Sequence, residues 1–341
     1  MKRPFRVPHS DEFGMLLDIV SYGSSALHEH GGRLTPGQIE QIRRTVQRVP
    51  EVMVKVLPRA SNDLKAAGKH LDYITRHGKL ALEADDGEPM ESRNGKALLE
   101  TWDLDIDDVR RQSGLAAVGG RKPPKLIHKL MFSMPAGTPP DKVLSAVRNF
   151  AREQFWGQHR YAFALHTDED HPHVHLVLKA VSEQGVRLNI RKATLRHWRS
   201  EFARSLRLLG VSANATDRAV RGKSQSAKKD GIYRTSLRGE STYLRAQAEA
   251  VAREFLKGDI RIEPGKKTLV ETRKKVKQGW FGLAGRLAHE GHADLASEVP
   301  GFVRAMPPSR TDRELVGEAL CQHAEKTKHP VQATEMFQPR S

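Results

Sequence analysis

The stretch His166-Thr-Asp-Glu-Asp-His-Pro-His173-Val-His175, followed at once by Leu-Val-Leu, carries the strongest structural and chemical pattern in this chain. Side chains alternate between the two faces of a strand, so His173 and His175 share one face and Val174, Leu176 and Leu178 take the other. The preceding segment 161–166 alternates in the same way and ends at His166. If the two strands are neighbours, the three imidazoles converge on one point. Because imidazole is the commonest neutral metal ligand, the pattern predicts a metal site.

The other polar residues of this stretch are placed around that site. His171 has the parity of the ligand pair, but Pro172 disturbs the start of the strand, so we expect His171 behind the ligands or facing the substrate. Asp168 and Asp170 could accept the N–H of a ligating ring and so fix its tautomer. The alternative to a metal site is a solvated, histidine-rich turn.

Composition narrows the class of partner. The chain of 341 residues has a formal net charge of +16. Such a balance favours a polyanionic partner, because each neutralised phosphate releases counterions, although charge for solubility alone is the alternative. The single cysteine excludes a disulfide framework or a cysteine-rich zinc module within the chain. No apolar run approaches the roughly 18 residues of a membrane span, and the N-terminus lacks a signal core, so we expect a cytoplasmic protein without membrane insertion.

Strand and helix patterns alternate irregularly along the chain. Strands are expected at 52–57, 125–133, 161–166, 173–178 and 185–190, and helices at 61–78, 139–155 and 191–209. This order predicts an α+β fold with a central, mostly antiparallel five-stranded sheet flanked by helices.

Four regions follow from the same patterns. They are an N-terminal helical extension (1–50), the sheet domain (51–211), a basic linker (212–240) and a helical C-terminal region (241–341). Residues 191–234, which begin with Arg191 and Lys192, contain twelve lysines or arginines and three acids. We interpret this excess as a surface that follows a nucleic-acid backbone; a solvated basic linker is the alternative.

Tyr73 is the candidate nucleophile. It lies near the end of the predicted helix at 61–78, with Lys69, Arg76 and Lys79 close to it in sequence. These cations would attract a phosphate. The ordinary alternative for a helical tyrosine is a half-buried packing role.

Three motifs together resemble the relaxase/mobilisation nuclease family, which includes conjugative plasmid relaxases and the border-nicking endonucleases of tumour-inducing plasmids. Residues 71–80 resemble its catalytic-tyrosine motif, residues 128–137 its middle motif with a serine and a Pro-Gly turn, and residues 166–175 its histidine–hydrophobe–histidine motif. The agreement covers about residues 50–210. Two features depart from the family pattern: about fifty residues precede the first strand, and Lys179 stands where many members carry asparagine.

The resemblance implies a palm-like relaxase fold that nicks single-stranded or melted DNA at a transfer origin. It implies a divalent metal ion, Mg²⁺ or Mn²⁺, held by His166, His173 and His175. Tyr73 would attack the phosphodiester and form a 5′-phosphotyrosyl intermediate. Asp168 would either orient a ligand histidine or help to deprotonate Tyr73, and the sequence does not separate these roles.

The resemblance also implies the contacts and partners of such an enzyme. We assign the DNA contacts to a set of polar residues: Lys69, Arg76, Lys79, Ser133, Lys179, Arg191 and Lys192. The partners would be single-stranded DNA at a transfer origin, accessory proteins of a nicking complex, a coupling protein and a type IV secretion system. The C-terminal hundred residues are the expected site for the protein contacts, and their basic ending is compatible with a secretion signal.

Three other functions stay open at this point. A replication or transposition initiator nuclease of the same superfamily would use the same chemistry. A metal-dependent hydrolase with three histidine ligands would act on a small molecule and use Tyr73 only for packing. A catalytically inactive DNA-binding module would bind without cleavage.

Overall fold

The computed structural model describes residues 33–58, 63–87, 89–90, 95–104, 109, 125–223, 235, 238–258, 263 and 265–328. Residues 1–32 of the expected N-terminal helical extension lie outside these ranges. Within them the chain forms two compact units, one over residues 34–216 and one over residues 217–328. The first unit contains every strand of the described residues, and the second is helical.

A six-stranded antiparallel sheet organises the first unit, with strand order β1-β4-β6-β5-β2-β3. The strands are β1 (Met53–Val56), β2 (Leu82–Ala84), β3 (Pro89–Met90), β4 (Ile127–Ser133), β5 (Tyr161–His166) and β6 (His173–Lys179). The predicted α+β class and antiparallel sheet are confirmed.

One of the five predicted strands, at residues 185–190, is wrong. Residues 185–190 form no strand and share only an isolated bridge, Val181 with Arg187, because both edges of β6 are already paired with β4 and β5. Gly185 turns this segment back with a φ of 77°, and the Leu188 N–H donates to the Ala180 carbonyl at 2.9 Å. The edge of β5 that does not pair with β6 is instead paired with β2.

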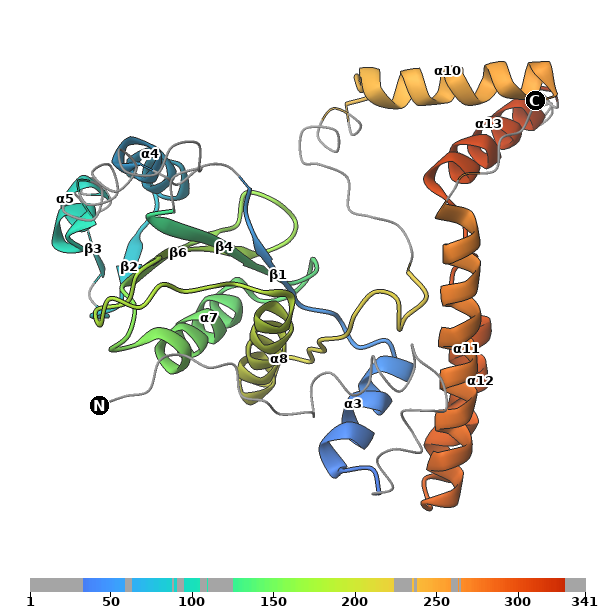
Figure 1. Cartoon of the computed structure of the whole chain (residues 1–341), viewed down its shortest axis with the longest axis horizontal. Coiled ribbons are helices and arrows are strands. Elements are labelled where there is room, and N and C mark those ends of the chain that lie inside the picture. Colours follow the sequence, from blue (N-terminus) through green and yellow to red (C-terminus); the bar gives the residue numbers. More distant parts are fainter. Residues whose placement is uncertain are drawn as a thin grey trace, which may run out of the picture. The chain divides into compact units, whose positions relative to one another are not determined.

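Helices cover both faces of the sheet (Figure 1). These helices are α4 (Leu64–Ile74), α5 (Gly95–Thr101), α7 (Pro140–Phe155) and α8 (Lys192–Leu208), whereas α3 (Pro36–Val46) precedes β1 in the chain. Helices α7 and α8 pack on one face and bury the larger core. Helices α4 and α5 pack on the other face around a smaller core. Asp63 begins α4 by accepting the Ala66 N–H at 2.6 Å.

The strand alternation decides which core each side chain enters. Val174 and Leu176 of β6 belong to the core under α7 and α8. Val177 belongs to the opposite core under α4 and α5. Because His173 and His175 have the parity of Val177, they lie on the α4 face of the sheet. The predicted division of the strand into an apolar face and a histidine face is confirmed.

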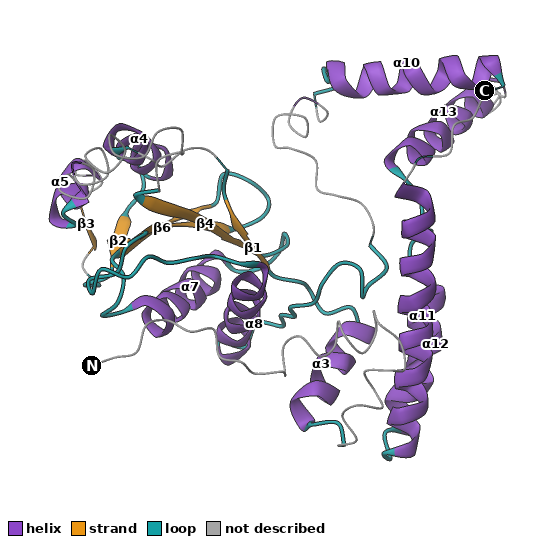
Figure 2. Ribbon diagram, viewed as in Figure 1, coloured by secondary structure: helices purple, strands orange, loops and turns teal. Residues whose placement is uncertain are grey.

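Among the described residues, the second unit contains α10 (Thr242–Lys257), α11 (Gly265–His289), α12 (Ala293–Arg304) and α13 (Asp312–Lys328) (Figure 2). Trp280 of α11 is fully buried, and its indole N–H donates to the Val220 carbonyl at 2.8 Å. Its ring contacts Phe302 of α12, with centroids 4.8 Å apart. Among the described residues, no helix is long and apolar enough to cross a bilayer.

Candidate metal and tyrosine site

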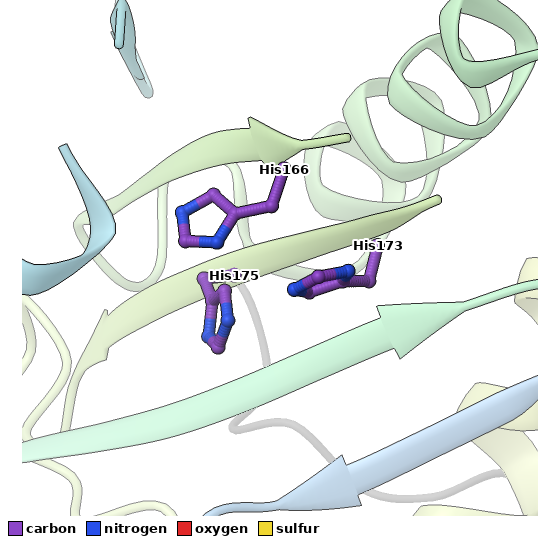
Figure 3. A group of neighbouring side chains, drawn as sticks. All are labelled: His166, His173 and His175. Atoms are coloured by element: carbon purple, nitrogen blue, oxygen red, sulfur yellow. The ribbon is translucent and has the colours of Figure 1, made fainter. Parts of the chain in front are cut away.

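Strand pairing brings the three histidines together. His166 ends β5 directly opposite His173, the first residue of β6. The ring centroids of His166 and His175 are 4.6 Å apart, and those of His173 and His175 are 5.2 Å apart. All three side chains are buried and point toward one another (Figure 3). One ring nitrogen from each histidine lies within 4.8 Å of the other two, so the arrangement could hold a metal ion.

Backbone carbonyls set the tautomers of two of these rings. His166 donates from Nε2 to the Ile74 carbonyl at 2.7 Å, and His173 donates from Nδ1 to the His171 carbonyl at 3.0 Å. A carbonyl can only accept, so each of these nitrogens carries the proton. The lone pairs of His166 Nδ1 and His173 Nε2 are therefore the ones available to a metal.

The unpaired ring atoms fit a bound cation. His166 Nδ1 and both nitrogens of His175 are buried and have no hydrogen-bond partner among the described residues. A buried polar atom without a partner costs free energy, which a metal–nitrogen bond would recover. Burial, followed by the charges of His166 and His173, lowers the pKa of His175 to about 2. Burial also lowers the pKa of His166. Neutral imidazole is the form that binds metals.

Asp168 does not have the contact expected of it. Neither it nor Asp170 accepts a proton from a ligand ring, because both lie in the exposed turn between β5 and β6 and the backbone carbonyls take that role. Asp168 instead forms an ion pair with Arg76. Burial opposes the shift, but the hydrogen bond from Arg76 and its charge lower the pKa of Asp168.

Tyr73 lies beside the histidines at the C-terminal end of α4. Its ring centroid is 5.6 Å from that of His175 and 6.1 Å from that of His166. The ring is 43% exposed, so one side faces solvent while the other contacts the histidines. The guanidinium carbon of Arg76 lies 5.0 Å from the centroid of the Tyr73 ring. This distance is typical of a cation–π contact.

An unusual turn follows Tyr73 and directs Arg76 back over it. Arg76 and His77 have φ values of 50° and 55°, and Gly78 has a φ of 90°. Left-handed backbone is unfavourable for residues other than glycine and often occurs at functional sites. The Thr75 hydroxyl donates to the Leu71 carbonyl at 2.9 Å, and the His77 N–H donates to the Asp72 carbonyl at 2.8 Å. These bonds hold the turn.

The sequence pattern did not assign His70 a role, yet it belongs to the site. Its ring stacks on Tyr73 with centroids 5.9 Å apart, and its Nε2 is buried without a hydrogen-bond partner. Burial, followed by the charges of Lys129 and His166, lowers the pKa of His70 to about 3. The available signal was periodicity: His70 shares the helical spacing of Ala67 and Ile74, which marks the buried face of α4.

The predicted DNA-contact residues are divided between different places. Ser133 ends β4 opposite His173 and is buried next to the triad. Lys69 and Lys79 are exposed and lie four residues before and six residues after Tyr73 in the chain. Lys179 is buried at the other end of β6, 3.5 Å from Glu183, so the structure does not bring it to the Tyr73 site, and its contact with DNA stays a prediction.

The remaining predicted residues lie away from the triad. Arg191 and Lys192 are exposed at the start of α8, the helix that packs on the opposite face of the sheet. His171 is exposed, and only its backbone carbonyl contacts a ligand histidine. The contact comes from the main chain, so a role of the His171 imidazole behind the ligands or toward the substrate stays a prediction.

The chain is similar in sequence to known proteins over the region that forms this site. Residues 73–207 match the family model described as relaxase, MobA/VirD2-like, nuclease domain. The chain is 26% identical over 206 residues to the T-DNA border endonuclease VirD2 of Rhizobium radiobacter, covering 50% of this chain and 43% of the relative. It is 24% identical over 242 residues to VirD2 of Agrobacterium fabrum, covering 61% of this chain and 49% of the relative. It is 28% identical over 133 residues to the 43 kDa relaxation protein of Salmonella typhimurium, covering 36% and 33%.

These matches define what is shared. The family match begins at Tyr73 and includes all three histidines of the triad. The resemblance inferred from the three motifs is therefore confirmed over the nuclease region. The chain spans less than half the length of each of these curated relatives.

Proposed function

We propose that this chain, which carries a nuclease domain of the MobA/VirD2-like relaxase family, is a DNA nicking enzyme that joins the cut strand to Tyr73. The main support is the distance of 5.6 Å between the ring centroids of Tyr73 and His175. A half-exposed nucleophile beside a buried cluster of metal-ligand nitrogens is suited to phosphoryl transfer. The names of two relatives, a border endonuclease and a relaxation protein, agree with this activity.

The proposed reaction exchanges one phosphodiester for another. The Tyr73 hydroxyl oxygen bonds to the scissile phosphorus as the bond to the 3′ oxygen breaks. The phenolic proton leaves to solvent, and the departing 3′ oxygen takes up a proton. The product is a 5′-phosphotyrosyl bond on the protein and a free 3′ hydroxyl on the DNA. Because the bond type is conserved, the reverse transfer rejoins a strand without another energy source.

The neighbouring residues have distinct roles in this proposal. His166 Nδ1, His173 Nε2 and a ring nitrogen of His175 would hold a divalent metal ion, Mg²⁺ or Mn²⁺, which supplies positive charge toward the scissile phosphate when bound. Arg76 lies against the Tyr73 ring and is anchored by Asp168, so it orients the nucleophile. Lys69 and Lys79 are exposed cations that attract the DNA backbone.

The substrate and partners belong to the same proposal. The substrate is single-stranded or locally melted DNA at a transfer origin, where an accessible strand can reach Tyr73. The partners are accessory proteins of a nicking complex, a coupling protein and a type IV secretion system, and the enzyme acts in the cytoplasm before transfer. The last residues of the chain, where a secretion signal was expected, lie outside the described residues.

The test is the covalent adduct itself. Single-stranded oligonucleotides that tile the transfer region of the encoding element would carry a 3′ label, because the 3′ fragment is the part that joins the protein. Wild-type protein with Mn²⁺ should give a labelled adduct that survives denaturing electrophoresis, and peptide mapping should locate it at Tyr73. Tyr73→Phe should abolish the adduct but retain DNA binding.

Tyr243→Phe is the matched control, because Tyr243 is 53% exposed in the helical unit. It should form the adduct at the wild-type rate. Full cleavage by Tyr73→Phe, or no adduct from wild type on any oligonucleotide, would refute the proposal. Metal-dependent hydrolysis of a small molecule by Tyr73→Phe would favour the hydrolase alternative.

A further inference from the structure

The long helix α11 carries an excess of positive charge outside the nuclease unit. Its 25 residues include seven lysines or arginines and one acid, Glu271. Three of the seven cations have protein partners within their own unit. Lys266 pairs with Glu314 at 2.7 Å, and Arg286 pairs with Glu290 at 2.7 Å. Arg273 donates to the carbonyls of Pro307 and Gly222.

The other four cations have no such partner. They are all exposed, and none forms an ion pair with a described residue: Lys267, Lys274, Lys275 and Lys277. Helix α11 has a net charge of +6 from its seven cations and one acid, whereas α10, α12 and α13 have net charges of +1, −1 and −1. The four lysines of α11 named above lie within about 15 Å along the helix.

Exposed apolar residues continue the same stripe. Positions 267, 270, 274, 277 and 281 follow the spacing 3, 4, 3, 4 that keeps side chains on one side of a helix, and Lys275 lies about 100° around the helix from Lys274. Val270 is 47% exposed and Phe281 is 51% exposed. A face that served only for solubility would not need a large aromatic side chain in line with its lysines.

The orientation of this stripe is held by the opposite side of α11. Trp280 and Leu283 are fully buried there, and Trp280 contacts Phe302 of α12. Because α12 covers the apolar side of α11 around Trp280, only the single apolar side chains Val270 and Phe281 are exposed beside the lysines, which is less than the continuous apolar face that a helix needs to enter a lipid surface. The partner that suits the exposed side is a flexible polyanion with flat rings.

We propose that Lys267, Lys274, Lys275, Lys277 and Phe281, here called the α11 stripe, bind single-stranded DNA. Lysine ammonium groups bind backbone phosphates as point charges, and the exposed Phe281 ring provides a surface for base stacking. This contact is separate from the Tyr73 site and does not require its chemistry. It would hold the strand without regard to sequence, because none of these side chains reads base edges by hydrogen bonding.

The test uses the full chain with Tyr73→Phe, so that binding is measured at equilibrium without covalent capture. Fluorescence anisotropy with a labelled 40-nucleotide oligothymidylate gives Kd over a range of salt concentrations. The fourfold variant Lys267→Gln, Lys274→Gln, Lys275→Gln and Lys277→Gln should lower the slope of log Kd against log salt by about 3, at roughly 0.7 for each phosphate that the protein no longer neutralises. Phe281→Ala should weaken binding about fivefold or more with little change in slope.

A matched control removes the same charge from exposed positions on the neighbouring helices: Arg245→Gln, Arg253→Gln, Lys257→Gln and Arg304→Gln. Its slope should stay within about 1 of wild type. Equal decreases in slope in the two fourfold variants would show that the effect comes from net charge alone and would overturn the proposal. An unchanged slope in the lysine variant would identify the stripe as a solvated face.

Two further measurements keep the alternatives apart. Loss of binding to phosphatidylserine vesicles in the lysine variant, with unchanged DNA binding, would overturn the proposal in favour of a membrane surface. In a chain that retains Tyr73, the lysine variant should still form the covalent adduct at saturating DNA. If wild type forms no adduct, the proposed nicking activity fails, while the salt slopes still decide whether the α11 stripe binds DNA.

Discussion

The variant Arg76→Lys tests whether Arg76 positions Tyr73 or only attracts DNA. The guanidinium of Arg76 contacts the Tyr73 ring and the Asp168 carboxylate together, whereas a lysine ammonium retains the charge but lacks the planar fork. The side chains of Arg76 and Asp168 are 30% and 50% exposed, so their ion pair contributes only about 0.2–1 kcal/mol. A cation–π contact at such a site adds about 0.5–1 kcal/mol.

These contributions set the expected kinetic effect. If these contacts hold Tyr73 in its attacking orientation, the variant must restore that orientation to reach the transition state, which raises the barrier by about 1–2 kcal/mol and slows adduct formation roughly fivefold to thirtyfold. Because Arg76→Lys conserves charge, the Kd for the oligonucleotide should change by less than about twofold. The measurement is the rate of adduct formation at saturating single-stranded DNA, together with Kd from anisotropy.

Asp168→Asn provides the second side of a double-mutant cycle. It removes the anchor of Arg76 without touching Tyr73, so its effect should be smaller than additive in the Arg76→Lys background. Lys79→Ala is the control, since Lys79 is exposed on the same turn. A wild-type rate in Arg76→Lys would refute the positioning role. So would an Arg76→Ala defect confined to Kd and to its salt slope.

Three further outcomes are expected. Burial keeps His70 and His175 neutral in the folded, metal-free protein, whereas in the unfolded chain they take up protons near pH 6.5. Their contribution to stability is thus complete above about pH 6.5 and falls by up to about 1.4 kcal/mol per pH unit for each histidine as the pH decreases toward their folded pKa values. Urea unfolding in EDTA at pH 7.5 and 5.5 measures this loss, and equal stabilities would contradict it. His175→Ala should abolish the rise in Tm on adding Mn²⁺, while His171→Ala, whose ring is exposed, should keep it; the reverse pattern would reassign the ligands. Phe202→Ala should lower the free energy of unfolding by about 3–5 kcal/mol, because the ring is fully buried against Phe132. A decrease below about 1 kcal/mol by chemical denaturation would show that the core relaxes around the gap.

Local patterns were sufficient for much of the site. The parity of residues along a strand depends only on the backbone, so the alternation in 161–178 predicted that His166, His173 and His175 would meet on one face. Helical periodicity and the order of the three motifs were likewise local or sequential properties. They led to the α+β class, the antiparallel sheet and the relaxase resemblance.

Edge pairing was not visible in the same way. The short strand β2 became part of the sheet because β5 had a free edge, and residues 185–190 failed to pair because β6 had none. Lys179 shows the same limit. Its position in the strand alternation matched the histidine face, but only the tertiary structure shows that its side chain is buried at that end of β6. Which edge is free, and which end is covered, depends on segments distant in sequence.

The sequence by itself determined which residues are the candidate reacting groups: three imidazoles at fixed strand parity, and a tyrosine near the end of a helix among cations. Only the tertiary structure decided how those groups are held. The carbonyl of Ile74 orients His166, and Asp168 turns to Arg76 instead of to a ligand ring. Every residue has a backbone carbonyl, so such a partner leaves no mark in the sequence. The partner is determined where α4 crosses the end of β5, by contacts between residues about ninety positions apart.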